Sequence, residues 1–158
     1  MRWLLLITLL IGGAARAADW QVPHRAGAIA DTLMQAADGD TLFLAPGTYY
    51  ENLVLDRPVT LDGQGHAILD GSQQGSTVTV TGPGVIIQGI TVQGSGSDHE
   101  TIDSGIQLTK TAKAPVVRNN ILLGNLYGVD IHGARDAVVQ NNVIKGRQDR
   151  HMNRRGNG

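Results

Sequence analysis

The chain has 158 residues, 41% of them hydrophobic, and its formal net charge is −1. This length is enough for one domain, and a charge close to zero gives no case for nucleic-acid binding. The absence of cysteine excludes disulfides and thiolate metal sites, so stability must come from packing.

The first 17 residues have the layout of a secretory signal peptide. Met1–Trp3 supplies a positive start, Leu4–Ile11 an apolar core, and Ala15–Ala17 a small-x-small cleavage site before Ala18. The alternative is an uncleaved membrane anchor, but the apolar run is well short of the roughly 20 residues that a span needs. We therefore predict that the mature chain is exported.

Residues 18–40 are predicted to form a leader and a capping helix. Asp19–Arg25 is a polar leader, and the apolar positions in Ala26–Asp38 fall at helical spacing before Gly39. The first coil of a solenoid has no neighbour on one side. A short amphipathic helix can cover its open apolar end.

Two stretches that lie 22 residues apart, Val116–Gly124 and Val138–Gly146, reveal an internal repeat. Each has a valine doublet, an asparagine doublet and a short apolar run that ends in glycine. A period of this length indicates a stacked repeat architecture, and each unit is too short for two helices. The repeat favours one coil of a parallel β-solenoid.

Three kinds of short strand recur from Thr41 onward. The first has two inward residues around an outward one, the second begins with apolar residues, and the third is a short run that ends in glycine. The members are Leu42/Leu44, Val78/Val80, Ile106/Leu108 and Val129/Ile131 for the first; Val59–Gly63, Val85–Gly89, Val116–Asn120 and Val138–Asn142 for the second; and Ile68–Gly71, Ile90–Gly94, Ile121–Gly124 and Val143–Gly146 for the third. We predict an all-β fold, a right-handed parallel β-helix over residues 41–158, with three faces, about 22 residues per coil and four to five coils.

The asparagine doublets are assigned a structural role. Asn tolerates left-handed backbone conformations and can hydrogen-bond nearby backbone groups. Asn119, Asn120, Asn141 and Asn142 are therefore predicted to stack as a side-chain ladder at one corner, above Gly89 and Gly63. Ligand binding by these side chains is the weaker alternative.

Two loops interrupt the period at one predicted corner. Between Gly94 and Gly105 the chain inserts ten residues, whereas the equivalent Gly124–Gly128 link is tight. The corner opens again between Gly146 and Gly158. Insertions at equivalent positions project from one face, which is often the binding face, so the loop bases should lie roughly 10 Å apart.

The clustered side chains that could bind a metal lie in these loops. They are Asp98 and His99 in the first loop, with Glu100 beside them, and His151 and Met152 in the second. Imidazole and thioether suit copper, whereas carboxylates favour harder ions. The spacing is not diagnostic, and ordinary polar loop residues are the alternative interpretation.

Asp130 and His132 point outward on one predicted strand and suggest acid–base chemistry. Polysaccharide lyases and epimerases on this fold use several carboxylates in a groove, often with calcium and a basic residue. Here the neighbouring coils offer Gln107 and threonines. No catalytic residue is therefore assigned, and a solvated strand surface is the expected role.

The segments Gly124–Ala137 and His151–Gly158 closely resemble the NosD family of periplasmic nitrous oxide reductase maturation proteins. The segment from Gly39 to Tyr49 resembles the first coil of carbohydrate-binding β-helix proteins. The NosD resemblance covers nearly all of the mature chain. It implies a periplasmic, non-enzymatic role with an inner-membrane ABC transporter, its permease and ATPase, in assembling the copper-sulfur cluster of nitrous oxide reductase, alongside a copper chaperone. It implies copper as the possible cofactor, and no contact with the membrane other than through the transporter.

Members of that family continue well beyond the position of Gly158. The sequence therefore predicts an N-terminal fragment of such a protein, with an open strand edge at its last coil that is prone to self-association. Two other functions stay open. One is a carbohydrate-active lyase or epimerase, and the other is a structural or sugar-binding solenoid.

Overall fold

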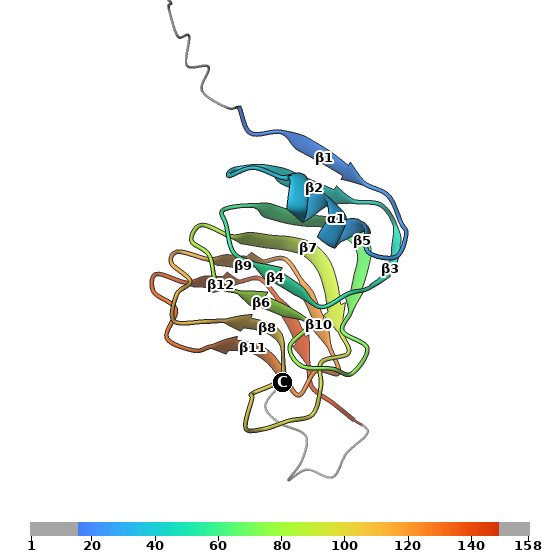
Figure 1. The fold of residues 1–158 in the computed structure, drawn as a ribbon. Helices are drawn as coiled ribbons and strands as arrows, with labels where there is room; N and C mark the ends of the chain where they lie inside the picture. The colour runs from blue at the N-terminus through green and yellow to red at the C-terminus, as the bar shows by residue number, and fades with distance from the viewer. Residues whose placement is uncertain (1–15, 149–158) are drawn as a thin grey trace, which may run out of the picture.

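The computed structural model describes residues 16–148 and consists of a parallel β-solenoid with one short helix (Figure 1). Its strands stack along one axis, from β1 at one end to β11, β12 and β13 at the other. Every strand pair in residues 16–148 is parallel. The predicted fold class is confirmed. Most of the predicted signal peptide, residues 1–15, and the end of the predicted solenoid from residue 149 lie outside the described residues.

Three faces run along the solenoid, and the long strands β5 and β7 each bend across two of them. The first face stacks β1 (Asp19–Val22), β2 (Thr41–Leu44), the start of β5 (Thr60–Asp70), the start of β7 (Ile86–Gln93), β9 (Val116–Arg118) and β12 (Val138–Gln140). The second stacks β3 (Gly47–Tyr50), the ends of β5 and β7, β10 (Ile121–Leu123) and β13 (Val143–Lys145). The third stacks β4 (Leu53–Leu55), β6 (Val78–Val80), β8 (Ser104–Leu108) and β11 (Tyr127–Ile131).

The core fills the space between the three faces with aliphatic side chains. Leu42, Leu61, Ile87 and Val117 are fully buried on the first face, since alternate residues of each strand point inward. Burial of a Val, Leu or Ile side chain stabilises the fold by about 1.5–3 kcal/mol. The repeated inward aliphatic positions therefore hold the coils together.

The structure corrects two details of the sequence interpretation at the N-terminal end. Asp19–Val22, the start of the predicted polar leader, is strand β1 and pairs in register with Thr41–Leu44. Leu42 and Leu44 lie on the first face, whereas Leu53–Leu55 takes the third-face position and pairs with Val78–Val80. Alternating apolar residues look the same on any face of a solenoid, so the pattern alone could not place them.

The capping helix α1 (Ala28–Gln35) covers the solenoid at the β1–β2 end (Figure 1). It is shorter than the predicted Ala26–Asp38 at both ends. Ala28 and Ile29 are buried, and Met34 on the opposite side is exposed, as expected for an amphipathic cap. No helix within residues 16–148 has the length and apolar character needed to cross a membrane.

Glu51 caps this helix from the next coil. The N-cap residue, Gly27, has no side chain that could accept a hydrogen bond. The Glu51 carboxylate takes that role, because it accepts hydrogen bonds from the backbone N–H of Ile29 at 3.3 Å and of Ala30 at 3.0 Å. A negative group also suits the positive end of the helix dipole.

Asp40 ties β1 to the end of α1. Asp40 is 3% exposed. Its carboxylate accepts hydrogen bonds from the backbone N–H of Ala18 at 2.7 Å, the indole N–H of Trp20 at 2.7 Å and the backbone N–H of Ala37 at 2.8 Å. These donors, the Ala18 N–H first, lower the pKa of Asp40 from its ordinary 3.8. They favour the charged form over the protonated acid.

We expect Asp40 to make stability depend on pH in acid. A carboxyl whose folded pKa is depressed stabilises the fold above its unfolded pKa, and that contribution is lost as the pH falls through the folded pKa. The free energy of unfolding should therefore fall below about pH 4, and Asp40→Asn should flatten this part of the profile. Urea denaturation at a series of pH values measures both. An equally steep acid profile in Asp40→Asn would assign the effect to other carboxyls.

Candidate functional site

The corner between the second and third faces carries the insertion loop and is the candidate functional site. Gln93, Leu123 and Lys145 are register partners at the ends of β7, β10 and β13. The chain leaves this corner directly after each of them. The loop after Gly94 and the chain after Gly146 therefore start from one corner, two coils apart. We call it the loop corner.

Arg147 joins the two loops. Its side chain is buried, at 4% exposure, and its Nη1 donates hydrogen bonds to the Gly96 carbonyl at 3.2 Å and the Ser97 hydroxyl at 2.8 Å. A guanidinium removed from water must make hydrogen bonds to offset its desolvation. The second loop thus holds the base of the first.

Asn125 stabilises the same corner from the coil that lies between the two loops. Its Oδ1 accepts from the Ser95 N–H at 3.2 Å, and its Nδ2 donates to the Val92 carbonyl at 2.9 Å. The hydroxyl of Ser95 accepts from the Leu126 N–H at 2.9 Å. The roles of Asn125 and Arg147 were not predicted from the sequence. For Asn125, the sequence did offer a signal: an asparagine that directly follows Gly124, at a different corner from the asparagine doublets.

Asp103 closes the insertion loop from within. Its carboxylate, 6% exposed, accepts hydrogen bonds from the Asp98 N–H at 2.9 Å and the Thr101 hydroxyl at 2.8 Å. Ile102 has a φ of 57°, which is unfavourable for a β-branched residue. The network holds the loop in one shape despite this strain.

His99 projects from the loop onto Tyr127 of β11. Its Nδ1 lies 2.9 Å from the Tyr127 hydroxyl, and the two rings meet edge to face with centroids 5.8 Å apart. Asp98, also exposed, accepts a hydrogen bond from the Glu100 N–H at 2.8 Å. The predicted ligands Asp98 and His99 are therefore neighbours on the exposed rim.

The described residues do not by themselves supply a three-ligand metal site. Within residues 16–148, no three His, Asp or Glu side chains come close enough together to hold a metal ion. The Nδ1 of His99 faces a tyrosine hydroxyl, and Asp98 offers a carboxylate oxygen, a ligand type that suits harder ions than copper(I). His151 and Met152, the other two predicted ligands, lie outside the described residues.

The predicted outward residues Asp130 and His132 lie at the end of β11, beside a neutral amide of the neighbouring coil and solvent. Gln107, the register partner of Asp130, approaches its carboxylate at 3.4 Å through Nε2. The side chain of His132 is exposed. Its backbone N–H donates to the Leu108 carbonyl at 2.8 Å and so extends the pairing of β8 with β11.

The four asparagines of the repeat take two different positions. Asn120 and Asn142 point inward and stack, because Asn120 Nδ2 donates to Asn142 Oδ1 at 3.1 Å. Asn119 and Asn141 instead have φ values of 56° and 55°, and both are exposed. Gly89, with a φ of 61°, takes the matching left-handed position in the coil below.

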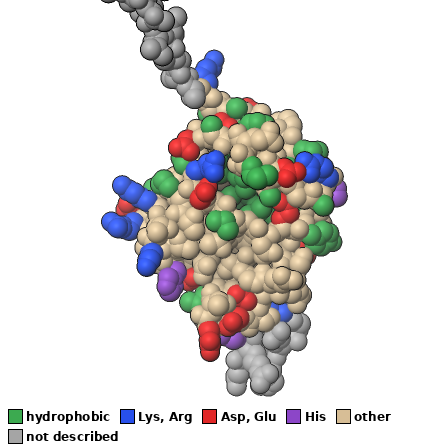
Figure 2. All heavy atoms as spheres, viewed as in Figure 1, with side chains coloured by type: hydrophobic (Ala, Val, Ile, Leu, Met, Phe, Trp, Pro, Cys, Tyr) green, Lys and Arg blue, Asp and Glu red, His purple; other side chains and the backbone are tan. Residues whose placement is uncertain are grey.

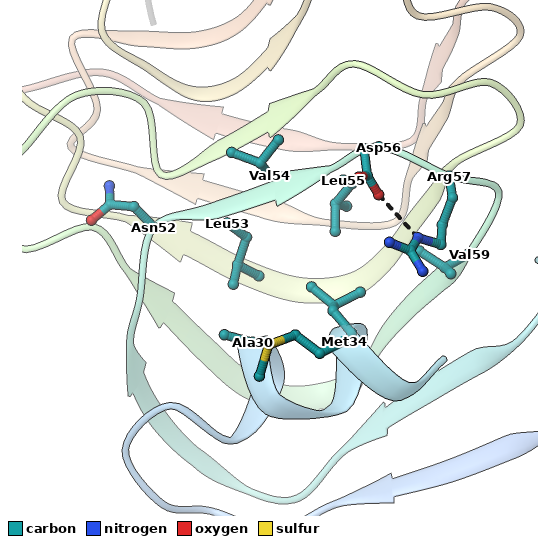
Figure 3. Close-up of a pocket in the computed structure, with 10 residues that line it drawn as sticks. Ala30, Met34, Asn52, Leu53, Val54, Leu55, Asp56, Arg57 and Val59 are labelled. Carbon is teal, nitrogen blue, oxygen red and sulfur yellow. Dashed lines mark hydrogen bonds and ion pairs between the residues drawn. The ribbon is translucent and has the colours of Figure 1, made fainter. Parts of the chain in front are cut away.

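An apolar groove of about 230 Å³ lies between α1 and β4, away from the loops (Figure 3). Met34 of the helix and Val54 of the strand line it and are 76% and 61% exposed. At one end Arg57 and Asp56 form an ion pair at 3.0 Å. The hydrogen bond from Arg57 lowers the pKa of the Asp56 carboxyl. This pairing favours the charged form of the carboxyl.

We expect Arg147→Met to loosen the insertion loop. The change removes the charged donor of the hydrogen bonds to Gly96 and Ser97, and each such bond contributes about 1.5–3 kcal/mol. Hydrogen exchange of the backbone amides of residues 96–98 should accelerate. The matched control is Lys145→Met, because Lys145 is an exposed cation of the same corner. This variant should change the free energy of unfolding by less than about 0.5 kcal/mol. Unchanged exchange in Arg147→Met would mean that the loop holds its shape through Asp103 and Asn125 alone.

No protein-family model matches the chain. It is 36% identical over 154 residues to a Pseudomonas aeruginosa protein named "Probable ABC transporter binding protein NosD", an alignment that covers 97% of this chain and 34% of that protein. A protein of the same name from Stutzerimonas stutzeri is 30% identical over 153 residues, or 96% of this chain and 33% of its own length. A cell surface glycoprotein of Methanothermus fervidus is 28% identical over 82% of this chain and 22% of its own length.

The matched residues include both the asparagine repeat and the loop corner, since the two NosD alignments cover 96% and 97% of the chain. The chain spans about one third of the length of these curated relatives. It is therefore a parallel β-solenoid that is similar to the NosD proteins over nearly all of its own length.

Proposed function

We propose that the chain acts in an exported, non-enzymatic accessory protein that works with an ABC transporter to assemble the copper-sulfur cluster of nitrous oxide reductase. One observation carries the proposal: the similarity to two proteins named as ABC transporter binding proteins extends across almost the whole chain. A copper chaperone and the reductase are the further partners in this proposal. Contact with the membrane would come through the transporter.

The solenoid supports a docking role rather than a catalytic one. Its side chains form a stiff stack in which Arg147 and Asn125 brace the loop corner. Binding surfaces gain from such rigidity, because less conformational entropy is lost on association. We assign the loop corner to contact with the transporter or the reductase.

Deletion of the gene that encodes this chain, in an organism that reduces nitrous oxide, tests the proposal. We expect the reductase to accumulate without its complete copper-sulfur cluster, as seen in its absorption and electron paramagnetic resonance spectra. Reintroduction of the gene should restore the cluster. A reductase with its full cluster in the deletion strain would contradict the proposed function.

A second complementation isolates the loop corner. In one gene, residues 95–104 are replaced by the short Asn125-Leu126-Tyr127 link of the next coil. In the control gene, only His66, an exposed residue outside the loop corner, is changed to Ala. We expect the shortened loop to leave the reductase without its cluster and the control to restore it. Restoration by both genes would remove the loop from the proposed role.

Copper handling by His99, His151 and Met152, with Asp98, stays a prediction. Titration of the full chain with copper in a competing chelator tests it, with His99→Ala compared with His66→Ala. His66 is the matched control, since it is an exposed histidine whose Nε2 lies 3.3 Å from the Leu44 carbonyl. A loss of affinity confined to His99→Ala would identify His99 as a ligand, and equal affinities would exclude it.

A further inference from the structure

Exposed cations gather at the corner between the third and first faces, on a different edge of the solenoid from the loop corner. Lys110 and Lys113 follow β8, and Arg135 follows β11 in the next coil. All three side chains are exposed. Figure 2 shows Lys and Arg atoms gathered along the edge of the molecule that the loops on the left of Figure 1 form. We call Lys110, Lys113 and Arg135 the basic corner.

The backbone holds two of these cations directly above one another. Lys113 and Arg135 form a parallel β-bridge, and the Ala114 N–H donates to the Arg135 carbonyl at 2.8 Å. The next residues, Ala114 and Asp136, repeat the same left-handed turn with φ values of 51° and 55°. Strands of neighbouring coils lie about 4.8 Å apart, so the two positive side chains leave the backbone side by side.

Lys110 extends the basic corner across the turn. A Cβ added to Gly133 would lie 3.2 Å from the Cβ of Lys110, which shows how closely the next coil passes over this lysine. Glycine at this position leaves the lysine side chain uncovered. The three cations therefore occupy two consecutive coils of one edge.

The cations of the basic corner differ from several others of the chain, which have close polar partners. Arg25 pairs with Asp31 at 2.8 Å, Arg57 with Asp56 at 3.0 Å, and Arg118 donates to Gln88 Oε1 at 2.9 and 2.8 Å. Within residues 16–148, the ion pairs do not include the three basic-corner cations, although Asp136 is adjacent in sequence to Arg135. Like charges directly opposite each other in a ladder destabilise it.

We propose that the basic corner docks an acidic segment of a partner protein. Carboxylates placed between Lys113 and Arg135 attract both cations and also relieve the repulsion between them. Because the basic corner and the loop corner lie on different edges, the inference does not depend on the assembly role.

A protein partner fits this corner better than an anionic membrane. Membrane recognition by charge uses clusters of about four to eight Lys or Arg, more than the three cations of this corner. The turns that carry them, residues 109–115 and 132–137, also contain no large apolar side chain that could enter a bilayer. The geometry favours carboxylates on a folded or extended polypeptide.

The test is the binding of a fluorescently labelled polyglutamate peptide to the full chain at low salt, measured by anisotropy. Lys113→Glu is compared with Arg25→Glu, which makes the same charge change at an exposed arginine beside the N-terminal cap. We expect Lys113→Glu to weaken binding about tenfold, and Arg25→Glu to weaken it by less than about twofold. Added salt should weaken the wild-type complex.

Three results would overturn the proposal. The first is no binding of polyglutamate to the wild-type chain, and the second is an equal loss in the two variants, which would mean that only net charge matters. The third is strong, Lys113-dependent binding to phosphatidylglycerol vesicles with no binding to the peptide, which would assign the corner to lipid. Circular dichroism of both variants checks that the solenoid is intact.

Discussion

Replacing Asn120 with alanine should lower the free energy of unfolding by about 3–5 kcal/mol, because it strips partners from buried backbone groups. Asn120 is 1% exposed; its Oδ1 accepts from the Ile90 N–H at 3.1 Å, and its Nδ2 donates to the Ile87 carbonyl at 3.0 Å. Both backbone groups would stay buried without this partner. Such a loss is a large part of the roughly 5–15 kcal/mol that stabilise a domain.

Asn119→Gly is the matched control for this prediction. Asn119 is adjacent in sequence but exposed, and glycine adopts its φ of 56° without strain. The stability of this variant should change by less than about 0.5 kcal/mol. Urea denaturation of both variants, followed by circular dichroism, measures the difference. A small loss in Asn120→Ala would mean that water enters the corner and satisfies the Ile87 and Ile90 groups.

Gly63→Ala should destabilise the chain by about 3 kcal/mol through a steric clash between coils. A Cβ at Gly63 would lie 2.5 Å from the Gly89 carbonyl oxygen and 2.7 Å from the Cα of Ile90. Both are backbone atoms of the next coil, so they cannot turn aside as a flexible side chain would. The two coils would have to separate at this corner.

Gly65→Ala separates the clash from backbone strain. Gly65 has a φ of 78°, but an added Cβ there has no atom within 4 Å. Gly65→Ala should therefore lower the free energy of unfolding by only about 1–2 kcal/mol, the strain of a left-handed backbone at a residue with a side chain. Thermal and urea denaturation of the two variants measure the difference. Equal losses would show that the coils adjust to a side chain at Gly63.

The asparagine repeat was enough to predict the fold class, because a stack of similar coils puts the same residue type at the same corner. The register of the last coils follows directly from Val116 pairing with Val138. At the N-terminal end this information is absent, since the coil from Thr41 to Thr60 carries no asparagine doublet. Leu42 and Leu44 were therefore predicted on the wrong face, and β1 was predicted as part of a polar leader.

The candidate site was predictable in its location but not in its contacts. Unequal link lengths after Gly94 and Gly124 indicated a loop at one corner, since inserted residues must leave the stack. The burial of Arg147 was not predictable, because a basic residue in a glycine-rich turn is ordinarily solvated. Leu123 and Lys145 are register partners, and Asn125 and Arg147 each lie two residues beyond them. Arg147 therefore takes the corner position that the buried Asn125 occupies in the coil below, and its burial follows from that position.

The inward asparagines also constrain how the length of this protein can change. Asn120 binds the N–H of one residue and the carbonyl of the residue three positions earlier in the coil below, and Asn142 repeats that geometry 22 residues later through Asn120 and Val117. Removal of residues 121–142 would join Asn120 to Val143, the register partner of Ile121, and should leave the corner intact. If a few residues more or fewer were removed, the side-chain amide of the inward asparagine would no longer lie opposite the N–H and the carbonyl that it binds in the coil below. Gains and losses of sequence within the stacked strands should therefore occur as whole turns, whereas loops that leave the stack at a corner, such as residues 95–104, can differ in length.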